Sequence, residues 1–496
     1  MGILADPIRK ITGAKPARRG GNFKMLALAF VALLIARAVN VFDVINRRIH
    51  KTPFGMTGCT LYPLMRAPED IVPVFDDVVL ASSDGRRTHL MKAVGVAKTQ
   101  MGQLFAIWRV DSPGKDPAAA PLALEGFPDD IAFRPYGMYY HPETAELLVV
   151  NHAYEMGGER IDVFKVEKTL PQVPLPKMHR SLKHDNSGTT SPLGAAAQLR
   201  EDGEDFQANG DGDKGSAGAK SKARGRAATA AAIANEVSEE TAPVKVSYSF
   251  SVEHELITSS FGVLGDLVLV GYDELYVTQS MPLPFPVGGP AHPAGLLETL
   301  RLYASRLLTM TRLARPPIIH CTRIRSKEIK CKHVARGHGI MYGGIAVSPD
   351  KKRLLVPDFL DLQVLVFNRS LTTGALTLQQ RLKMPGSPKN LELDYSRVAE
   401  GEEVYSVALQ HPWDMVAYGR VMEGASDPAA GDKMRLAGGV ATLAYEESTG
   451  RYSSSLEMWR NDSLFAISSA AAMPSGVRLL GSSVSPGFML CRHPSL

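Results

Sequence analysis

Short segments of alternating apolar and polar residues recur along this chain from Val72 onward, at intervals of roughly ten residues. Most are rich in β-branched residues and are bounded by Gly, Pro, Asp or Asn. They include residues 77–81 (DVVLA), 103–110 (QLFAIWRV), 147–151 (LLVVN), 161–166 (IDVFKV), 266–271 (DLVLVG), 353–357 (RLLVP), 363–368 (QVLVFN) and 403–408 (EVYSVA). A period of two places successive side chains on opposite faces of a strand. The pattern therefore predicts an all-β fold.

A weak internal repeat narrows this prediction. Three units begin near His141, Ser348 and Leu393, and each consists of a turn, a strand, a loop and a second strand. The last two starts lie about 45 residues apart, which is typical of one blade of a β-propeller. The 496 residues would also suit two or three ordinary domains. Because four-stranded blades arranged radially can occupy about 400 residues as one domain, we expect a single propeller.

Composition excludes several classes of protein. With 45% hydrophobic and 22% charged residues, the chain is neither disordered throughout nor fibrous. The 56 basic and 51 acidic residues give a net charge of +5, so no nucleic-acid partner is expected. The sequence has no G-x-S-x-G, H-E-x-x-H, Walker A or C-x-x-C motif, which leaves the common hydrolase, zincin and redox signatures unsupported.

The N-terminal segment predicts membrane targeting. Residues 1–24 carry six basic residues and one acid, and residues 25–36 (MLALAFVALLIA) form an apolar run that continues past Arg37 to Phe42. One interpretation is an uncleaved single-pass anchor over 25–42, and the other is a signal peptide cleaved after Ala38. We prefer the anchor. The basic flank then keeps the N-terminus cytosolic and places the body in the lumen or outside the cell, within the secretory pathway. Two sequons, at Asn368 and Asn461, are candidate glycosylation sites in such a body.

Two stretches depart from the strand pattern. Residues 184–243 contain almost no aromatic residues and are predicted to be a disordered insertion in a hairpin loop of the domain. Residues 294–315 have Leu296, Leu300, Tyr303, Leu307 and Met310 at helical spacing, with arginines on the other side. They predict an amphipathic helix, which either packs on the domain or lies on the membrane surface.

Several short motifs occur in one order along the chain, and together they resemble the paraoxonase/arylesterase family. They are GCTL (58–61) with PEDI (68–71), FRPYG (133–137), LVVNH (148–152), DLVLVG (266–271), YGGI (342–345) with SPD (348–350), and FMLC (488–491). The resemblance extends from about Cys59 to Cys491, apart from the insertion. It implies a six-bladed propeller behind a hydrophobic N-terminal leader, with two calcium ions in the central tunnel.

The resemblance assigns ligands to both calcium ions. For the structural ion it implies Asp70, the backbone carbonyl of Met138, and Asp266. For the catalytic ion it implies Glu69 and Asn390, whereas the three remaining ligand positions correspond to Gly265, Gly343 and Lys389. Calcium requires six to eight oxygen ligands, so the second site is incomplete. An ammonium at position 389 would either repel this ion or pair with Glu69 and replace its charge.

Further roles follow from the same resemblance. The family's histidine pair corresponds to His152 and Tyr136, and a phenol is a poor general base at neutral pH. Cys59 and Cys491 correspond to the disulfide that joins the first strand to the last. Cys321 and Cys331 are additional, and they flank a predicted turn either as a cross-strand disulfide or as two reduced thiols.

Two functions are therefore open. The first is a membrane-anchored, calcium-dependent hydrolase of small aryl esters or lactones, in which Glu69, Asn390 and His152 contribute to the site. The second is a non-catalytic propeller that keeps only the structural calcium and acts as a binding module. Because a fold does not establish a function, the geometry at Lys389 decides between them.

Overall fold

The computed structural model describes residues 25, 28–33, 35–36, 55, 58–84, 102–112, 114–153, 158–169, 242–253, 262–283, 295–313, 315–326, 328–398, 400–411, 437–460, 466–483 and 487–492. Contacts divide the chain into two units, of which one comprises Met1–Thr169 with Thr241–Leu496 and the other Leu170–Glu240. The second unit, and with it nearly all of the predicted insertion over 184–243, lies outside the described residues. Asn461 also lies outside them.

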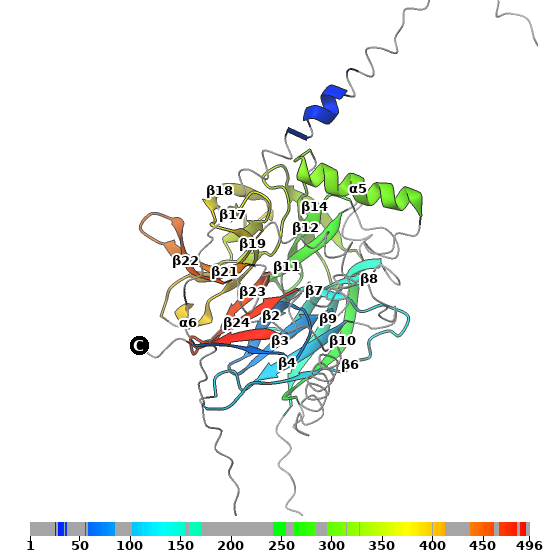
Figure 1. Cartoon of the computed structure of the whole chain (residues 1–496). Helices are drawn as coiled ribbons and strands as arrows, with labels where there is room; N and C mark the ends of the chain where they lie inside the picture. The colour runs from blue at the N-terminus through cyan, green and yellow to red at the C-terminus, as the bar shows by residue number, and fades with distance from the viewer. Residues whose placement is uncertain are drawn as a thin grey trace, which may run out of the picture. The chain divides into compact units, whose positions relative to one another are not determined.

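The strands of the described residues form six sheets (Figure 1). Neighbouring strands are antiparallel, except that β6 pairs in parallel with β10. In hydrogen-bonded order, the first sheet is β2 (Pro68–Phe75), β3 (Val78–Ser83), β4 (Gln103–Trp108) and β5 (Ala118–Pro121), and the second is β7 (Pro135–His141), β8 (Glu146–Ala153), β9 (Gly158–Lys168), β10 (Val244–Glu253) and β6 (Leu124–Glu125). The third sheet is β11 (Val263–Gly271), β12 (Glu274–Met281), β13 (Ile318–Thr322) and β14 (Lys330–Ala335), and the fourth is β15 (Ala346–Val347), β16 (Arg353–Asp358), β17 (Gln363–Arg369) and β18 (Leu376–Lys383). The fifth sheet is β19 (Ser387–Leu393), β20 (Val404–Gln410), β21 (Gly438–Glu446) and β22 (Arg451–Arg460), and the sixth is β23 (Ile467–Ala472), β24 (Arg478–Ser482), β25 (Phe488–Cys491) and β1 (Cys59–Tyr62).

The first strands of the six sheets contact one another in a closed cycle. Strand β2 contacts β7, and the contacts continue through β11, β15, β19 and β23 back to β2. These strands are therefore the inner strands around a central axis, and each sheet is one blade. The predicted six-bladed, all-β propeller is confirmed.

The core lies between the blades. Six hydrophobic clusters fill the six gaps between neighbouring sheets. A strand inside a blade is thus covered on both faces, and β8 and β20 are buried at every position. This explains why many strands read as nearly continuous apolar runs rather than as strict alternation.

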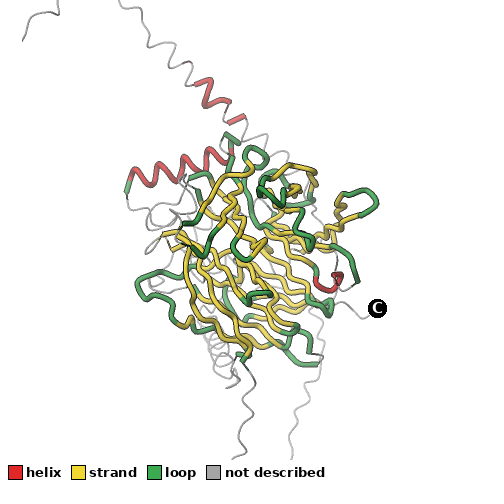
Figure 2. Tube along the Cα trace, turned by 180° about the vertical axis from the view of Figure 1, so that it is seen from behind, coloured by secondary structure: helices red, strands yellow, loops and turns green. Residues whose placement is uncertain are grey.

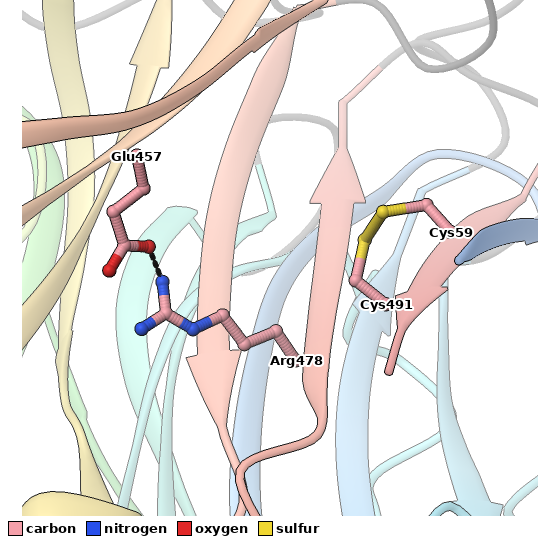
Figure 3. The surroundings of a disulfide bond; sticks show 4 residues. All are labelled: Cys59, Glu457, Arg478 and Cys491. Carbon is pink, nitrogen blue, oxygen red and sulfur yellow. Dashed lines mark ion pairs between the residues drawn. A yellow bond between two sulfur atoms is a disulfide. The ribbon is translucent and has the colours of Figure 1, made fainter. Parts of the chain in front are cut away.

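Two disulfides are present, and the predicted bond between Cys59 and Cys491 is confirmed. It joins β1 to β25, so the first strand of the domain completes the sheet made by the last three (Figure 3). Arg478 on β24 forms an ion pair with Glu457 on β22 of the preceding sheet, as Figure 3 also shows. Cys321 and Cys331, left open between a bond and two thiols, are joined across β13 and β14.

The helix predicted over 294–315 is α5 (Leu296–Met310), which lies outside the strands of the propeller (Figure 2). It is buried through Leu302, Ser305 and Thr309, whereas Leu296 and Leu300 are exposed. Helix α5 contacts β12 of the domain, while the apolar side chains of Leu296, Leu300, Tyr303 and Leu307 are exposed. A second helix, α6 (Tyr395–Val398), is a single turn.

The described residues between 25 and 36 are helical, and their apolar side chains are exposed. Among the residues with a described structure, none of the helices combines the length and the apolar character needed to cross a bilayer.

Candidate functional site

Eleven residues line a small cavity at the propeller axis that is partly open to solvent. Each of the six inner strands, or the segment just before it, contributes at least one of them. They are Glu69, Asp70, Tyr136, Gly137, Gly265, Asp266, Gly343, Gly344, Lys389, Asn390 and Ser468. The structure therefore brings together nearly all the residues that the family resemblance assigned to the two calcium sites.

Lys389 fills the position beside Glu69. Its Nζ lies 3.3 Å from Glu69 Oε1, and both side chains are largely buried. The same ammonium donates a hydrogen bond to the Tyr136 hydroxyl and lies 4.6 Å from the centre of the Tyr136 ring. The carboxylate that would hold a catalytic calcium ion is thus already neutralised by a cation of the chain itself.

The glycines at the other two ligand positions leave no room for a ligating side chain. A Cβ at Gly343 would overlap the backbone carbonyl of Lys389, and a Cβ at Gly265 would lie 2.7 Å from Thr278 Oγ1. Thr278 Oγ1 in turn donates a hydrogen bond of 2.8 Å to the Gly343 carbonyl. The strands approach each other closely at both positions, so a larger side chain at either one would require the backbone to move.

Asp70 and Asp266 form a buried acidic pair deeper in the same cavity. Asp70 Oδ2 accepts a hydrogen bond from the Met138 N–H at 2.7 Å, and Asp266 Oδ2 accepts one from Ile345 N–H at 3.3 Å. Burial, and then the charge of Glu69, raise the pKa of Asp70 to about 7. Burial and the neighbouring Asp70 raise the pKa of Asp266 well above its usual value. The charge of Lys389 lowers the pKa of Asp266, but it does not offset the burial of the pair.

This pair fits one hard cation. Asn390 Nδ2 donates a 2.7 Å hydrogen bond to Asp70 Oδ1, whereas the buried Asn390 Oδ1 accepts none within the described part of the chain. Gly137 permits the approach, since a Cβ there would overlap Asp266 Oδ1. Two carboxylates and an amide oxygen are donors that calcium prefers. In the ranges that the structure describes, no three His, Cys, Asp or Glu side chains converge on one metal position, so backbone or water oxygens would complete the shell.

His152 and Tyr136 lie next to each other, with ring centres 4.6 Å apart. The sequence did not reveal the partner of His152, which is Glu159: Nδ1 lies 2.6 Å from Glu159 Oε1. The same Oε1 accepts the Leu264 N–H at 2.9 Å, which fixes the carboxylate. His152 and Glu159 are directly opposite in the β8–β9 pairing, so a correct hairpin register would have identified this contact.

No protein-family model and no curated protein matches this chain. Three of the similar solved structures are propellers or lactonases by name. A periplasmic gluconolactonase of Pseudomonas aeruginosa is 11% identical, with a TM-score of 0.36 over 84% of this chain and 78% of that one. A putative 6-phosphogluconolactonase of Bacteroides fragilis is 9% identical, with a TM-score of 0.35 over 83% and 76%. The WD40 propeller domain of Doa1 is 9% identical, with a TM-score of 0.36 over 88% and 96%. Because these identities and TM-scores are low, the propeller is assigned from the strand pairing described above, and no activity of these proteins is attributed to this chain.

Proposed function

We propose that the chain is a membrane-anchored propeller of the paraoxonase/arylesterase type that acts as a binding protein and is not a calcium-dependent hydrolase. The observation that carries this proposal is the 3.3 Å contact between Lys389 Nζ and Glu69 Oε1. An ammonium there supplies the positive charge that the family obtains from its catalytic ion, and the close approach at Gly343 keeps further ligands out. Asp70, Asp266 and Asn390 would hold one calcium ion, whose role is to neutralise the buried acids.

The test is hydrolysis by the full chain in detergent. Phenyl acetate and a lactone are assayed with calcium and with chelator, for the wild type and for Glu69→Gln. We expect no turnover that depends on calcium. Calcium-dependent turnover that disappears in Glu69→Gln would overturn the proposal, because Glu69 would then be serving a metal ion.

A second function has one specific observation in its favour. The contact of 2.6 Å between His152 Nδ1 and Glu159 Oε1 fixes the ring next to the Tyr136 phenol, so that Nε2 is the nitrogen that would act as a base. This arrangement supports hydrolysis of an ester or lactone without a metal ion. Turnover that persists in chelator and is lost in His152→Gln would favour it over the binding protein.

The membrane anchor and the exocytoplasmic location rest on the basic flank and apolar run of residues 1–42, and the two disulfides support an oxidising compartment. Asn368 on β17 is exposed and open to glycosylation. Expression in a eukaryotic host should therefore give a glycosidase-sensitive mobility shift that decreases in Asn368→Gln. A chain that carries no glycan would contradict this topology.

A further inference from the structure

The positive charge of this chain is concentrated in two short segments. Residues 312–338 and 369–388 together carry eleven Lys and Arg residues and one acid, Glu328. The whole chain has a net charge of only +5, so the remainder is net acidic. The two segments include β14 and β18, which are the outermost strands of two neighbouring blades.

These two outer strands lie against each other. They are in contact, and hydrogen bonds cross between the blades from Lys332 Nζ to the Thr373 carbonyl at 2.7 Å and from Arg381 Nη1 to the His338 carbonyl at 2.8 Å. Arg315 likewise donates to the Gly337 carbonyl. These bonds hold three basic side chains in place while leaving them exposed.

The exposed basic side chains of this region form what we call the basic face. Its members are Arg315, Lys330, Lys332, Arg336, Arg381 and Lys383. Two acids of the neighbouring segments are engaged by other arginines, since Glu328 pairs with Arg323 at 3.2 Å and Asp361 pairs with Arg312 at 2.8 Å. Six exposed basic side chains close together produce a positive field that can attract an anionic partner.

The shape of the basic face indicates the kind of partner. Lys330 and Lys332 are two residues apart on β14, as are Arg381 and Lys383 on β18, so each strand presents charges about 7 Å apart along its length. Such parallel rows suit an extended polymer with regularly repeated anionic groups rather than a small anion in a pocket. Neither strand carries a Phe, Tyr or Trp residue, the large aromatic side chains that form stacking platforms for nucleic-acid bases.

The cellular compartment of the protein also limits which anionic polymers it can meet. The hairpin that carries β14 is itself closed by the disulfide between Cys321 and Cys331, and disulfides persist in oxidising, exocytoplasmic surroundings. We propose that the basic face binds an acidic polysaccharide, one that bears sulfate or carboxylate groups along a linear chain. The basic face shares no residue with the axial cavity, so this inference does not depend on the role proposed for that cavity, whereas the choice of a polysaccharide rests on the exocytoplasmic location proposed above.

Binding of the full chain to immobilised heparin, in neutral detergent, tests the inference. The variant Lys330→Glu/Lys332→Glu/Arg381→Glu reverses three charges of the basic face. The matched control Lys115→Glu/Lys168→Glu/Arg451→Glu makes the same change of net charge at exposed positions away from the basic face, in the loop before β5, on β9 and on β22. Thermal unfolding of each variant checks folding, and Lys→Gln and Arg→Gln versions replace any variant that does not fold.

We expect the basic-face variant to bind heparin about tenfold more weakly or worse, with a reduced dependence on salt, and the control to bind nearly as the wild type does. Neutral dextran should not compete. Equal losses in both variants, or no loss in either, would overturn the inference. The basic N-terminal segment is present in the wild type and in both variants, so binding of heparin through that segment would not distinguish the three proteins. A competition experiment separates a polysaccharide from a lipid surface. If micelles that contain phosphatidylserine displace the protein from immobilised heparin at the same concentration of negative charge as soluble heparin does, the inference is overturned in favour of a lipid surface.

Discussion

Lys389 shows what a family resemblance can reveal about a single residue. The alignment of motifs placed Lys389, Glu69, Asp70 and Asp266 around one tunnel, and the structure places all four at one cavity. The alignment could not determine whether the lysine side chain turns toward Glu69 or away from it, since that depends on its rotamer and on Tyr136. Nor could it find Glu159, whose contact with His152 depends on the register of a hairpin.

Replacement of Lys389 by Met should destabilise the protein by about 3 kcal/mol, because it leaves a buried carboxylate without its cation. The double variant Lys389→Met/Glu69→Gln should recover most of this loss, since it removes both charges. Urea unfolding in the presence of chelator measures both effects. A single variant as stable as the wild type would show that the contact between Lys389 and Glu69 contributes nothing.

Asp358 at the end of β16 makes stability depend on pH. Its Oδ1 accepts hydrogen bonds from Ile340 and Met341 N–H, but burial, followed by the charge of Asp361, raises its pKa to about 6. The folded state therefore binds the proton more tightly than the unfolded state, in which the pKa is about 3.9. This contribution to stability is complete below about pH 4 and is lost as the pH rises through 6.

Lowering the pH from 7.5 to 5 should accordingly raise the free energy of unfolding by about 1 kcal/mol through Asp358. In Asp358→Asn this part of the pH dependence should disappear, whatever the variant costs in stability at any one pH. Urea unfolding at the two pH values gives the comparison, and the same slope in both proteins would refute it.

At the scale of elements, the strands were predictable and the helix face was not. Strands such as β8, β16 and β17 read directly from apolar runs bounded by turn residues. Helix α5 was located to within a few residues, yet it is buried through Leu302, Ser305 and Thr309. Helical periodicity identifies an apolar face but does not determine which face meets the domain, because tertiary contacts decide that.

The two disulfides should differ in what they contribute. The bond between Cys59 and Cys491 spans 432 residues, and that between Cys321 and Cys331 spans 10. In the chain-entropy model the first is worth about 6 kcal/mol and the second about 3 kcal/mol. Paired Cys→Ser variants should therefore lower the midpoint of thermal unfolding more for Cys59/Cys491 than for Cys321/Cys331. The reverse order would mean that the ring stays closed by strand pairing alone.

For the whole molecule, net charge proved a poor guide to the surface. A value of +5 gave no reason to expect a concentrated basic region, yet β14 and β18 bring two basic segments side by side. The strand pattern predicted the length of one blade but not the number of blades. The number six came from the family resemblance. The closed cycle of inner strands shows six blades, and the pairing of β1 with β25 completes the last of them.

The account depends most on the claim that Lys389 replaces the catalytic calcium ion. Calorimetric titration of calcium into the full chain, stripped of metal with chelator and held in neutral detergent, tests it directly. We predict one ion per chain, with the same stoichiometry in Glu69→Gln and no binding in Asp266→Asn. Two ions per chain, with one of them lost in Glu69→Gln, would contradict the account.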